Sequence, residues 1–432
     1  MTPGARASAA IEILADIETR KRPAAEALKD WGISHRFAGS GDRAAIGNLV
    51  FDCLRTRASA AFAMGEGSPR ALVLRTLVTQ WQMTPEQVAA LADGSRHTPE
   101  PLSEAELAGL KREIPATALP HVRGDYPEWL GPEFERAFGD RAPEQGAALA
   151  RRAPVDLRVN TLKADRDKVL KALRRFEPKP TPHSPFGIRV AQAQGPGRSP
   201  HLEAEPGHGK GWYEVQDEGS QLATILSGAG PRQQVIDLCA GAGGKTLGLA
   251  ALMENTGQLY AYDADPLRLR PIFERLKRAG VRNVQVPPAG DREALAKLEG
   301  KMDLVLIDAP CSGSGVWRRR PDAKWRLAPQ MLEARRAEQK IVLEEGASLV
   351  KPGGRLAYIT CSVLPSENRD QVDIFLARHP EFKRIPWPEL WERSLPGQTP
   401  VPSADGSGET LLMTPRDHGT DGFFVAVMQR SE

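Results

Sequence analysis

From Gly228 to the end of the chain, short apolar segments alternate with stretches of helical character. Strands that alternate with helices form a parallel sheet with helices on both faces. Such α/β folds bind their ligands at the carboxyl ends of the strands, so the chemistry is expected just beyond those ends. The predicted strands are Val235–Cys239, Leu259–Asp263, Val284–Val286, Leu304–Ala309 and Arg355–Cys361.

The rest of the sequence predicts two further parts. Residues 1 to about 95 show helical patterns, clearest from Arg43 to Arg57, with Asp42 as the predicted N-cap and Cys53 on the apolar face. Residues 96–125 are rich in Pro, Glu and His, which indicates a linker or an irregular connection. Residues 126–228 combine a strand pattern near Leu157 with a basic helix over 162–176. We therefore expect domains at 1–125, 126–228 and 229–432.

Composition excludes several classes of protein. The 58 Lys and Arg residues exceed the 55 Asp and Glu residues by a net charge of only +3, so the chain is not basic throughout. No apolar run approaches the ~18 residues of a membrane helix, and the N-terminus lacks a signal-peptide core. The four cysteines are far apart without a CxxC pair, which disfavours a disulfide framework or a zinc module. We expect a cytoplasmic protein with free thiols, no metal and no membrane segment.

A glycine-rich loop follows the first predicted strand of the α/β part, and three interpretations compete for it. A phosphate-binding P-loop fits Gly244-Lys245-Thr246, but Cys239 stands where its first glycine belongs. A dinucleotide fingerprint fits Gly241 and Gly243, but Thr246 occupies its third glycine position. An S-adenosylmethionine loop needs only a tight glycine turn and an acid for the ribose hydroxyls. Asp263 ends the next strand, where that acid belongs.

Two cysteines follow predicted strands at the same edge of the sheet. Cys311 lies in Asp308-Ala-Pro-Cys311, and Cys361 follows Thr360. A thiolate that adds to C6 of cytosine converts the electron-poor ring into an enamine, whose C5 can attack a methyl sulfonium. A carboxylic acid near N3 and the 4-amino group, for which Asp308 is the candidate, would stabilise the developing charge.

Taken together, these residues resemble the RNA cytosine-C5 methyltransferases of the Sun type, in particular the bacterial small-subunit ribosomal RNA methyltransferase B group. The resemblance covers essentially the whole chain. Its motifs are Asp308-Ala-Pro-Cys311, Thr360-Cys361-Ser362 with the following Val-Leu-Pro-Ser-Glu-Asn368, Tyr213–Gln221, Arg158–Leu162 and Asp421–Phe424. It implies an all-α NusB-like N-terminal domain, a small α+β RNA-binding subdomain and an α/β Rossmann-like methyltransferase domain.

The resemblance also implies roles for individual residues. Cys361 would be the nucleophile, Cys311 would help to release the product, and Asp308 would lie between cofactor and base. S-adenosylmethionine would be held by Asp263, Asp308 and the loop residues Cys239, Ala240, Gly241, Ala242, Gly243, Gly244 and Lys245. Two features depart from the family pattern: the loop lacks the usual proline, and the third cofactor acid is matched only by Asp291.

The expected substrate is 16S ribosomal RNA, and the expected state is a monomer. Trp317–Arg326 carries a net charge of +4 between two tryptophans, which predicts an RNA contact beside the Cys311 loop. A second possible basic surface runs from Lys163 to Arg175. Two alternatives stay open at this point. One is a transfer-RNA cytosine methyltransferase, which would share every catalytic residue, and the other is a non-catalytic RNA-binding assembly factor.

Overall fold

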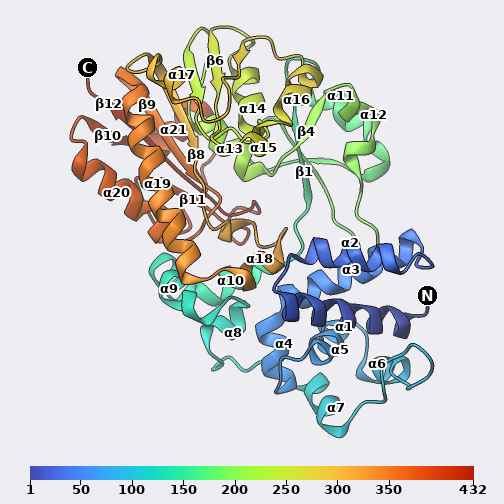
Figure 1. Cartoon of the computed structure of the whole chain (residues 1–432). Coiled ribbons are helices and arrows are strands. Elements are labelled where there is room, and N and C mark those ends of the chain that lie inside the picture. Colours follow the sequence, from blue (N-terminus) through green and yellow to red (C-terminus); the bar gives the residue numbers. More distant parts are fainter. The chain divides into compact units, whose positions relative to one another are not determined.

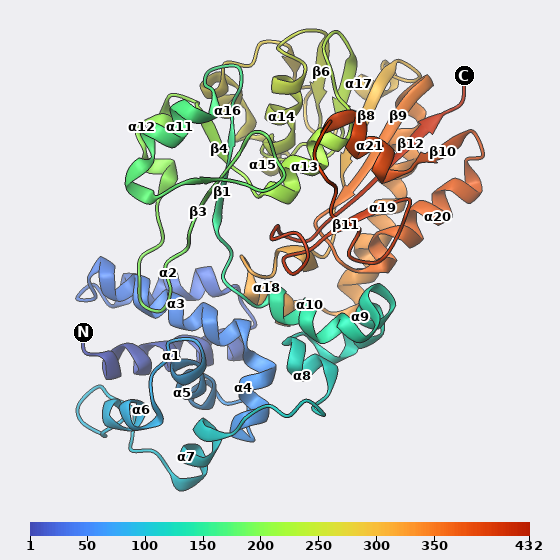
Figure 2. The same ribbon diagram turned by 180° about the vertical axis from the view of Figure 1, so that it is seen from behind.

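The computed structural model describes residues 1–432, and the chain divides into two compact units (Figures 1 and 2). The helical unit comprises Met1–Ala153, Gln192–Pro200 and Trp317–Leu327. The sheet unit comprises Pro154–Ala191, His201–Val316 and Ala328–Glu432. The expected boundaries at 125 and 228 are not tested by this division and remain a prediction. None of the helices is both long and apolar enough to cross a membrane.

The helical unit packs short helices around one apolar core. Leu14, Leu49, Cys53 and Leu74 are among its fully buried residues, which confirms the prediction that Cys53 is a core residue. Burial raises the pKa of the Cys53 thiol, so this cysteine is inert. The helices are α1 (Pro3–Arg20), α2 (Ala24–Ser34), α3 (Ser40–Arg55), α4 (Arg57–Met64), α5 (Pro69–Thr79), α6 (Pro85–Leu91), α7 (Glu104–Lys111), α8 (Pro120–Gly124), α9 (Gly131–Phe138), α10 (Ala142–Leu149) and α18 (Pro321–Arg326).

Two local predictions for this unit are wrong. The N-cap of α3 is Gly39, and Asp42 lies in the first turn, where it accepts hydrogen bonds from the N-terminal ammonium at 3.2 Å and from Arg6 Nε at 2.8 Å. The helix dipole favours an acid in the first turn, so in the sequence such an acid looks like an N-cap residue. The stretch 96–125 is not merely a connection, because it contains α7 and α8, and Leu110 is buried in the core.

The basic run Trp317–Arg326 is largely internal to the helical unit. Trp317 is 1 % exposed and its ring lies 6.0 Å from that of Phe134, while Lys324 is also 1 % exposed. Lys324 Nζ donates to the carbonyl oxygens of Arg55 and Asp125, and Trp325 Nε1 donates to the carbonyl of Leu54 at 2.6 Å. The predicted stacking of these tryptophans on RNA bases is therefore wrong for Trp317. Lys324 likewise cannot contact phosphates from this position.

The sheet unit begins with a small antiparallel sheet of order β2-β3-β1-β4. The strand predicted near Leu157 is present, and Leu157 lies in the core of this part. The predicted helix begins only at Arg166, because Asp165 caps it by accepting a hydrogen bond from Lys168 N at 2.7 Å. The elements are β1 (Val155–Val159), α11 (Arg166–Ala172), β2 (Lys179–Pro180), β3 (Gly187–Val190), α12 (Pro206–Gly209) and β4 (Tyr213–Val215).

The second sheet of this unit has the order β10-β12-β9-β8-β5-β6-β7, with β11 paired to β12. All five predicted strands are present, with ends shifted by a few residues. These five strands run parallel to one another, as predicted, whereas β12 runs antiparallel to β9 and β10 and makes the sheet mixed. The chain reaches β12 from β11 without the helical crossover that a parallel strand requires. The strands are β5 (Gln234–Asp237), β6 (Gln258–Ala261), β7 (Val284–Gln285), β8 (Met302–Asp308), β9 (Val350–Thr360), β10 (Phe382–Ile385), β11 (Leu411–Met413) and β12 (Phe423–Arg430).

Helices cover both faces of this sheet. Leu304 and Leu306 of β8 point into a core shared with α13 and α14, whereas Ile307 contacts the opposite helix α19 at Gly346. Figure 1 shows α19 and α20 in front of the sheet, and Figure 2, from behind, shows α13 and α21 in front. The helices are α13 (Glu218–Leu226), α14 (Gly244–Leu252), α15 (Pro266–Leu269), α16 (Ile272–Ala279), α17 (Arg292–Ala296), α19 (Pro329–Leu349), α20 (Arg369–Arg378) and α21 (Trp387–Ser394).

Candidate active site

The predicted site residues follow neighbouring parallel strands of the large sheet. β5 pairs with β6 on one side and β8 on the other, and β8 pairs with β9. Because these strands are parallel, their carboxyl ends meet at one edge. The glycine loop, Asp263, Asp308 and Cys361 therefore belong to the same edge of the sheet.

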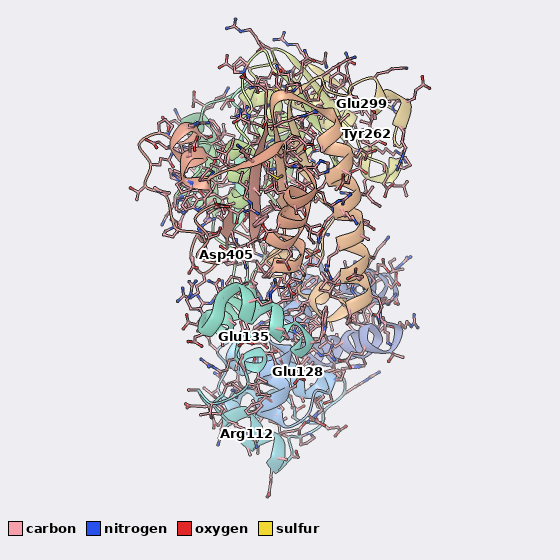
Figure 3. The ribbon with its side chains drawn as sticks, turned by 90° about the vertical axis from the view of Figure 1, so that its left-hand side faces the viewer. Arg112, Glu128, Glu135, Tyr262, Glu299 and Asp405 are labelled. Atoms are coloured by element: carbon pink, nitrogen blue, oxygen red, sulfur yellow. The ribbon has the colours of Figure 1, made fainter.

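The glycine loop is held by Asp263. Gly241 has a φ of +49° and its backbone nitrogen donates to Asp263 Oδ2 at 2.9 Å. Gly243 has a φ of +84°, and a Cβ there would come within 2.6 Å of Ile272, so this position requires glycine. Asp265 N donates to the other oxygen, Asp263 Oδ1, at 2.9 Å. Asp263 thus joins the end of β6 to the turn that precedes α14 (Figure 3 labels the neighbouring Tyr262).

Lys245, at the start of α14, forms an ion pair with Asp308 at the end of β8. Lys245 Nζ lies 2.7 Å from Asp308 Oδ2. The lysine side chain is 5 % exposed, whereas that of Asp308 is 36 % exposed, so the carboxylate stays accessible to a ligand. The pair connects the start of α14 with the end of β8.

A buried acid that the sequence analysis did not single out lies beneath the loop. Asp237, the last residue of β5, is fully buried and accepts a hydrogen bond from Thr246 Oγ1 at 2.7 Å, while its Oδ1 has no hydrogen-bond partner. Burial raises its pKa to about 7. Its position as an acid at a strand end before the glycine loop was the available signal.

Cys239 follows Asp237 but is not activated as a nucleophile. Burial raises the pKa of its thiol well above the usual range, and the charges of Asp237, Asp263 and Asp308 raise it further. The three neighbouring carboxylates therefore disfavour a thiolate at this position.

The structure brings Cys311 and Cys361 together. Their Sγ atoms lie 3.5 Å apart, although the residues are 50 positions apart in the chain. Both are half-buried. The hydrogen bond to Cys361 and burial raise the pKa of the Cys311 thiol. The two loops are also joined through the backbone, because Gly315 N donates to the carbonyl of Cys361 at 2.9 Å.

Asp291 caps a helix next to this site. Its Oδ1 accepts a hydrogen bond from Ala294 N at 3.0 Å, which makes it the N-cap of α17. The preceding residue, Gly290, donates from its backbone nitrogen to the carbonyl of Asp263 at 3.3 Å. The loop before Asp291 therefore contacts the end of β6, and the role of Asp291 as a cofactor acid stays a prediction.

The mixed sheet with its glycine loop and acidic strand ends has the architecture of a Rossmann-like methyltransferase domain. Consistent with this class, the fold is similar to a methyltransferase homolog protein from Pyrococcus horikoshii, with a TM-score of 0.59 and 27 % identity, covering 74 % of this chain and all of that one. Residues 224–429 match the family described as 16S rRNA methyltransferase RsmB/F, and residues 126–195 match an RsmF/B-like, ferredoxin-like domain.

Sequence relatives point to the same family. The ribosomal RNA small subunit methyltransferase B of Salmonella heidelberg is 30 % identical over 408 residues, which cover 89 % of this chain and 90 % of the relative. A probable ribosomal RNA small subunit methyltransferase B of Synechocystis is 33 % identical over 310 residues, covering 71 % and 67 %. The chain belongs to the RsmB/F family of 16S rRNA methyltransferases.

Proposed function

We propose that this protein transfers a methyl group from S-adenosylmethionine to C5 of a cytosine in 16S ribosomal RNA, through a covalent bond between Cys361 and C6 of the base. The observation that carries this proposal is the 3.5 Å separation of Cys311 Sγ and Cys361 Sγ beside the glycine loop. Membership of the RsmB/F family supports the rRNA substrate. Covalent catalysis at C6 accounts for a pair of cysteines at this edge of the sheet.

The strand ends fit S-adenosylmethionine, which when bound supplies an electrophilic methyl group. The tight turn at Gly241 and Gly243 lets backbone approach the ligand closely, and it needs no phosphate. Asp263 would hold the ribose hydroxyls, and the half-buried Cys239 would line the site. The carboxylate of Asp263 already accepts Gly241 N, so the loop and the ribose acid are fixed relative to each other.

Three residues near the base would have different catalytic roles. The Cys361 thiolate adds to C6, and the C4–C5–C6 unit becomes an enamine whose C5 takes the methyl group. Asp308, accessible and paired with Lys245, would share a proton with N3, which neutralises the electron density that the addition pushes there, and would accept a hydrogen bond from the 4-amino group. After transfer, C5 loses its proton to solvent, the C5–C6 double bond re-forms and the C6–S bond breaks, while the Cys311 thiol, 3.5 Å from Cys361 Sγ, donates a hydrogen bond to the departing Cys361 thiolate.

The target base must leave its stack to reach a thiol at the edge of the sheet, so a loop or an opened helix is expected as the substrate. With the run Trp317–Arg326 largely internal, the second basic surface is the better RNA contact. Lys163, Lys168, Lys171 and Arg174 are exposed, and Lys168 Nζ lies 4.3 Å from the ring centroid of Trp212. Exposed cations beside a tryptophan suit phosphates and bases.

Mass mapping of ribosomal RNA from a strain that lacks this gene tests the proposal. We expect one 5-methylcytosine to disappear from 16S rRNA and to return with the wild-type gene but not with Cys361→Ala. Loss from transfer RNA instead would favour the transfer-RNA methyltransferase. An unchanged pattern, together with binding of the protein to rRNA, would identify a non-catalytic assembly factor.

A further inference from the structure

Glu367 is a buried acid that touches the loops of both cysteines. It belongs to the short turn Pro365–Glu367 after β9, and its side chain is fully buried. Its Oε1 accepts hydrogen bonds from Ser312 N at 2.7 Å and from Gln339 Nε2 at 3.1 Å. Its Oε2 accepts from Ser312 Oγ and Ser362 Oγ, each at 2.5 Å. Ser312 follows Cys311 and Ser362 follows Cys361, so one carboxylate connects the two neighbours.

The hydroxyl groups of this network also contact neighbouring backbone and side-chain groups. Ser312 Oγ accepts a hydrogen bond from Ser314 N at 3.3 Å, and Ser362 Oγ accepts one from Leu364 N at 3.1 Å. Ser362 Oγ also lies 2.9 Å from Ser314 Oγ. Burial raises the pKa of Glu367, and the hydrogen bonds from Ser312, Ser362 and Gln339 oppose that shift because they stabilise the ionised carboxylate.

That charge is not neutralised within its hydrogen-bonding shell. The four donors are a backbone amide, two hydroxyls and the Gln339 amide, and none of them is a cation. In a poorly solvated site, a negative charge acts strongly on a neighbouring thiol. The hydrogen bond to Cys361, burial and the charge of Cys361 are the larger causes of the raised pKa of the Cys311 thiol, and the negative charge of Glu367 raises it further.

We propose that Glu367 is a positioning residue that fixes the Cys311 loop against the Cys361 loop, and that its negative charge disfavours the thiolate form of Cys311. This inference rests on the proposed function. It gives the two cysteines, which share one sheet edge and touch each other, different surroundings through one buried acid. A protonated Cys311 is also the form that cannot compete for C6.

Alkylation by iodoacetamide tests the proposal without RNA, so its outcome is independent of whether 16S rRNA is the substrate. In full-length Cys361→Ala protein, the alkylation rate of Cys311 is followed from pH 6 to pH 10 by peptide mass spectrometry. Adding Glu367→Gln removes the charge and keeps the shape. We expect the midpoint to fall by about one pH unit, which makes alkylation at pH 8 about tenfold faster. Glu299→Gln, at an exposed acid of the same unit (Figure 3), is the control and should change nothing.

A second substitution separates charge from shape. Glu367→Asp keeps the charge on a shorter side chain, so the Cys311 profile should stay within a few tenths of a pH unit of the parent. The proposal is overturned if Glu367→Gln leaves the profile unchanged, or if Glu367→Asp lowers the midpoint as far as Glu367→Gln does. It is also overturned if the buried Cys53 is alkylated faster to the same degree, since that reports unfolding. Should Glu367→Gln fail to fold, the Glu367→Asp profile decides alone.

Discussion

Lys245 Nζ lies 2.7 Å from Asp308 Oδ2, so the start of α14 and the end of β8 are joined by one buried ammonium group. In the proposed mechanism this lysine fixes the position of the acid that faces the base. Lys245→Met should therefore lower the rate of methyl transfer by about a hundredfold, the scale for losing one preorganised electrostatic contact. Single-turnover transfer to 16S rRNA measures this rate.

The same strand provides a matched control for that prediction. Asp303 lies near the start of β8 and pairs with Lys351, whose side chain is 45 % exposed. Exposed pairs contribute little, so Lys351→Met should keep the transfer rate within about twofold of wild type. Equal losses in both variants would show that Lys245 acts through stability of the sheet unit and not through Asp308.

Alanine variants of the two cysteines should differ in whether a covalent protein–RNA complex accumulates. Cys361→Ala removes the proposed nucleophile, so neither transfer nor a covalent complex is expected. Cys311→Ala should form the bond to C6 but release it slowly, and a protein–RNA adduct should accumulate as a slower band in a denaturing gel. An adduct that requires Cys311 and persists in Cys361→Ala would reverse the two roles.

Asp263 and Asp291 make a pair of tests for the cofactor site. Asp263 holds Gly241 N and is the proposed ribose ligand, so Asp263→Ala should weaken S-adenosylmethionine binding by about a hundredfold, or roughly 3 kcal/mol. Asp291→Asn keeps the helix cap and removes the charge, so it isolates any contact with the cofactor. Calorimetric titration of each variant measures the affinity. An unchanged affinity in Asp263→Ala would show that Asp263 does not bind the cofactor.

The strand ends could be predicted from the sequence because apolar runs and the residues that follow them are local signals. Asp263, Asp308 and Cys361 were found in this way, and the parallel topology then brought them to one edge. The role of Glu367 could not be found from such local signals. The partners of Glu367 lie as far as 55 residues away, at Ser312, and nothing local distinguishes a buried acid from an exposed one.

For the basic run Trp317–Arg326, a local signal predicted an exposed surface that the structure does not have. Consecutive charges usually indicate a solvated surface. Lys324 is nevertheless buried, because the carbonyl oxygens of Arg55 and Asp125 accept hydrogen bonds from its Nζ. Those partners lie about 200 to 270 residues away in the sequence. Only the tertiary structure shows that Trp317–Leu327, which follows the Cys311 loop in the chain, is part of the helical unit.

Lys324 is therefore expected to affect stability more than RNA binding. Lys324→Met removes two hydrogen bonds from a buried amine, whose pKa burial lowers to about 7, and leaves buried carbonyls without a partner, which should cost about 2–4 kcal/mol of unfolding free energy. Arg326→Met, at a side chain that is 37 % exposed, should cost less than about 1 kcal/mol. Urea unfolding measures both. If Lys324→Met left the stability unchanged and lowered the salt dependence of RNA binding, the run Trp317–Arg326 would contact RNA after all.

Asp237 should make the stability of the protein depend on pH. Its folded pKa is raised to about 7, whereas an exposed aspartate titrates near 3.9, so between about pH 4 and pH 7 the folded state binds a proton that the unfolded state lacks. Stability contributed by this group is complete below pH 4 and is lost as the pH rises to 7, by roughly 4 kcal/mol at most. Asp237→Asn can still accept from Thr246 and carries no charge. In urea unfolding without cofactor, we expect the variant to exceed the wild type at pH 8 and to approach it toward pH 4, whereas parallel curves at the two pH values would contradict a buried titrating Asp237.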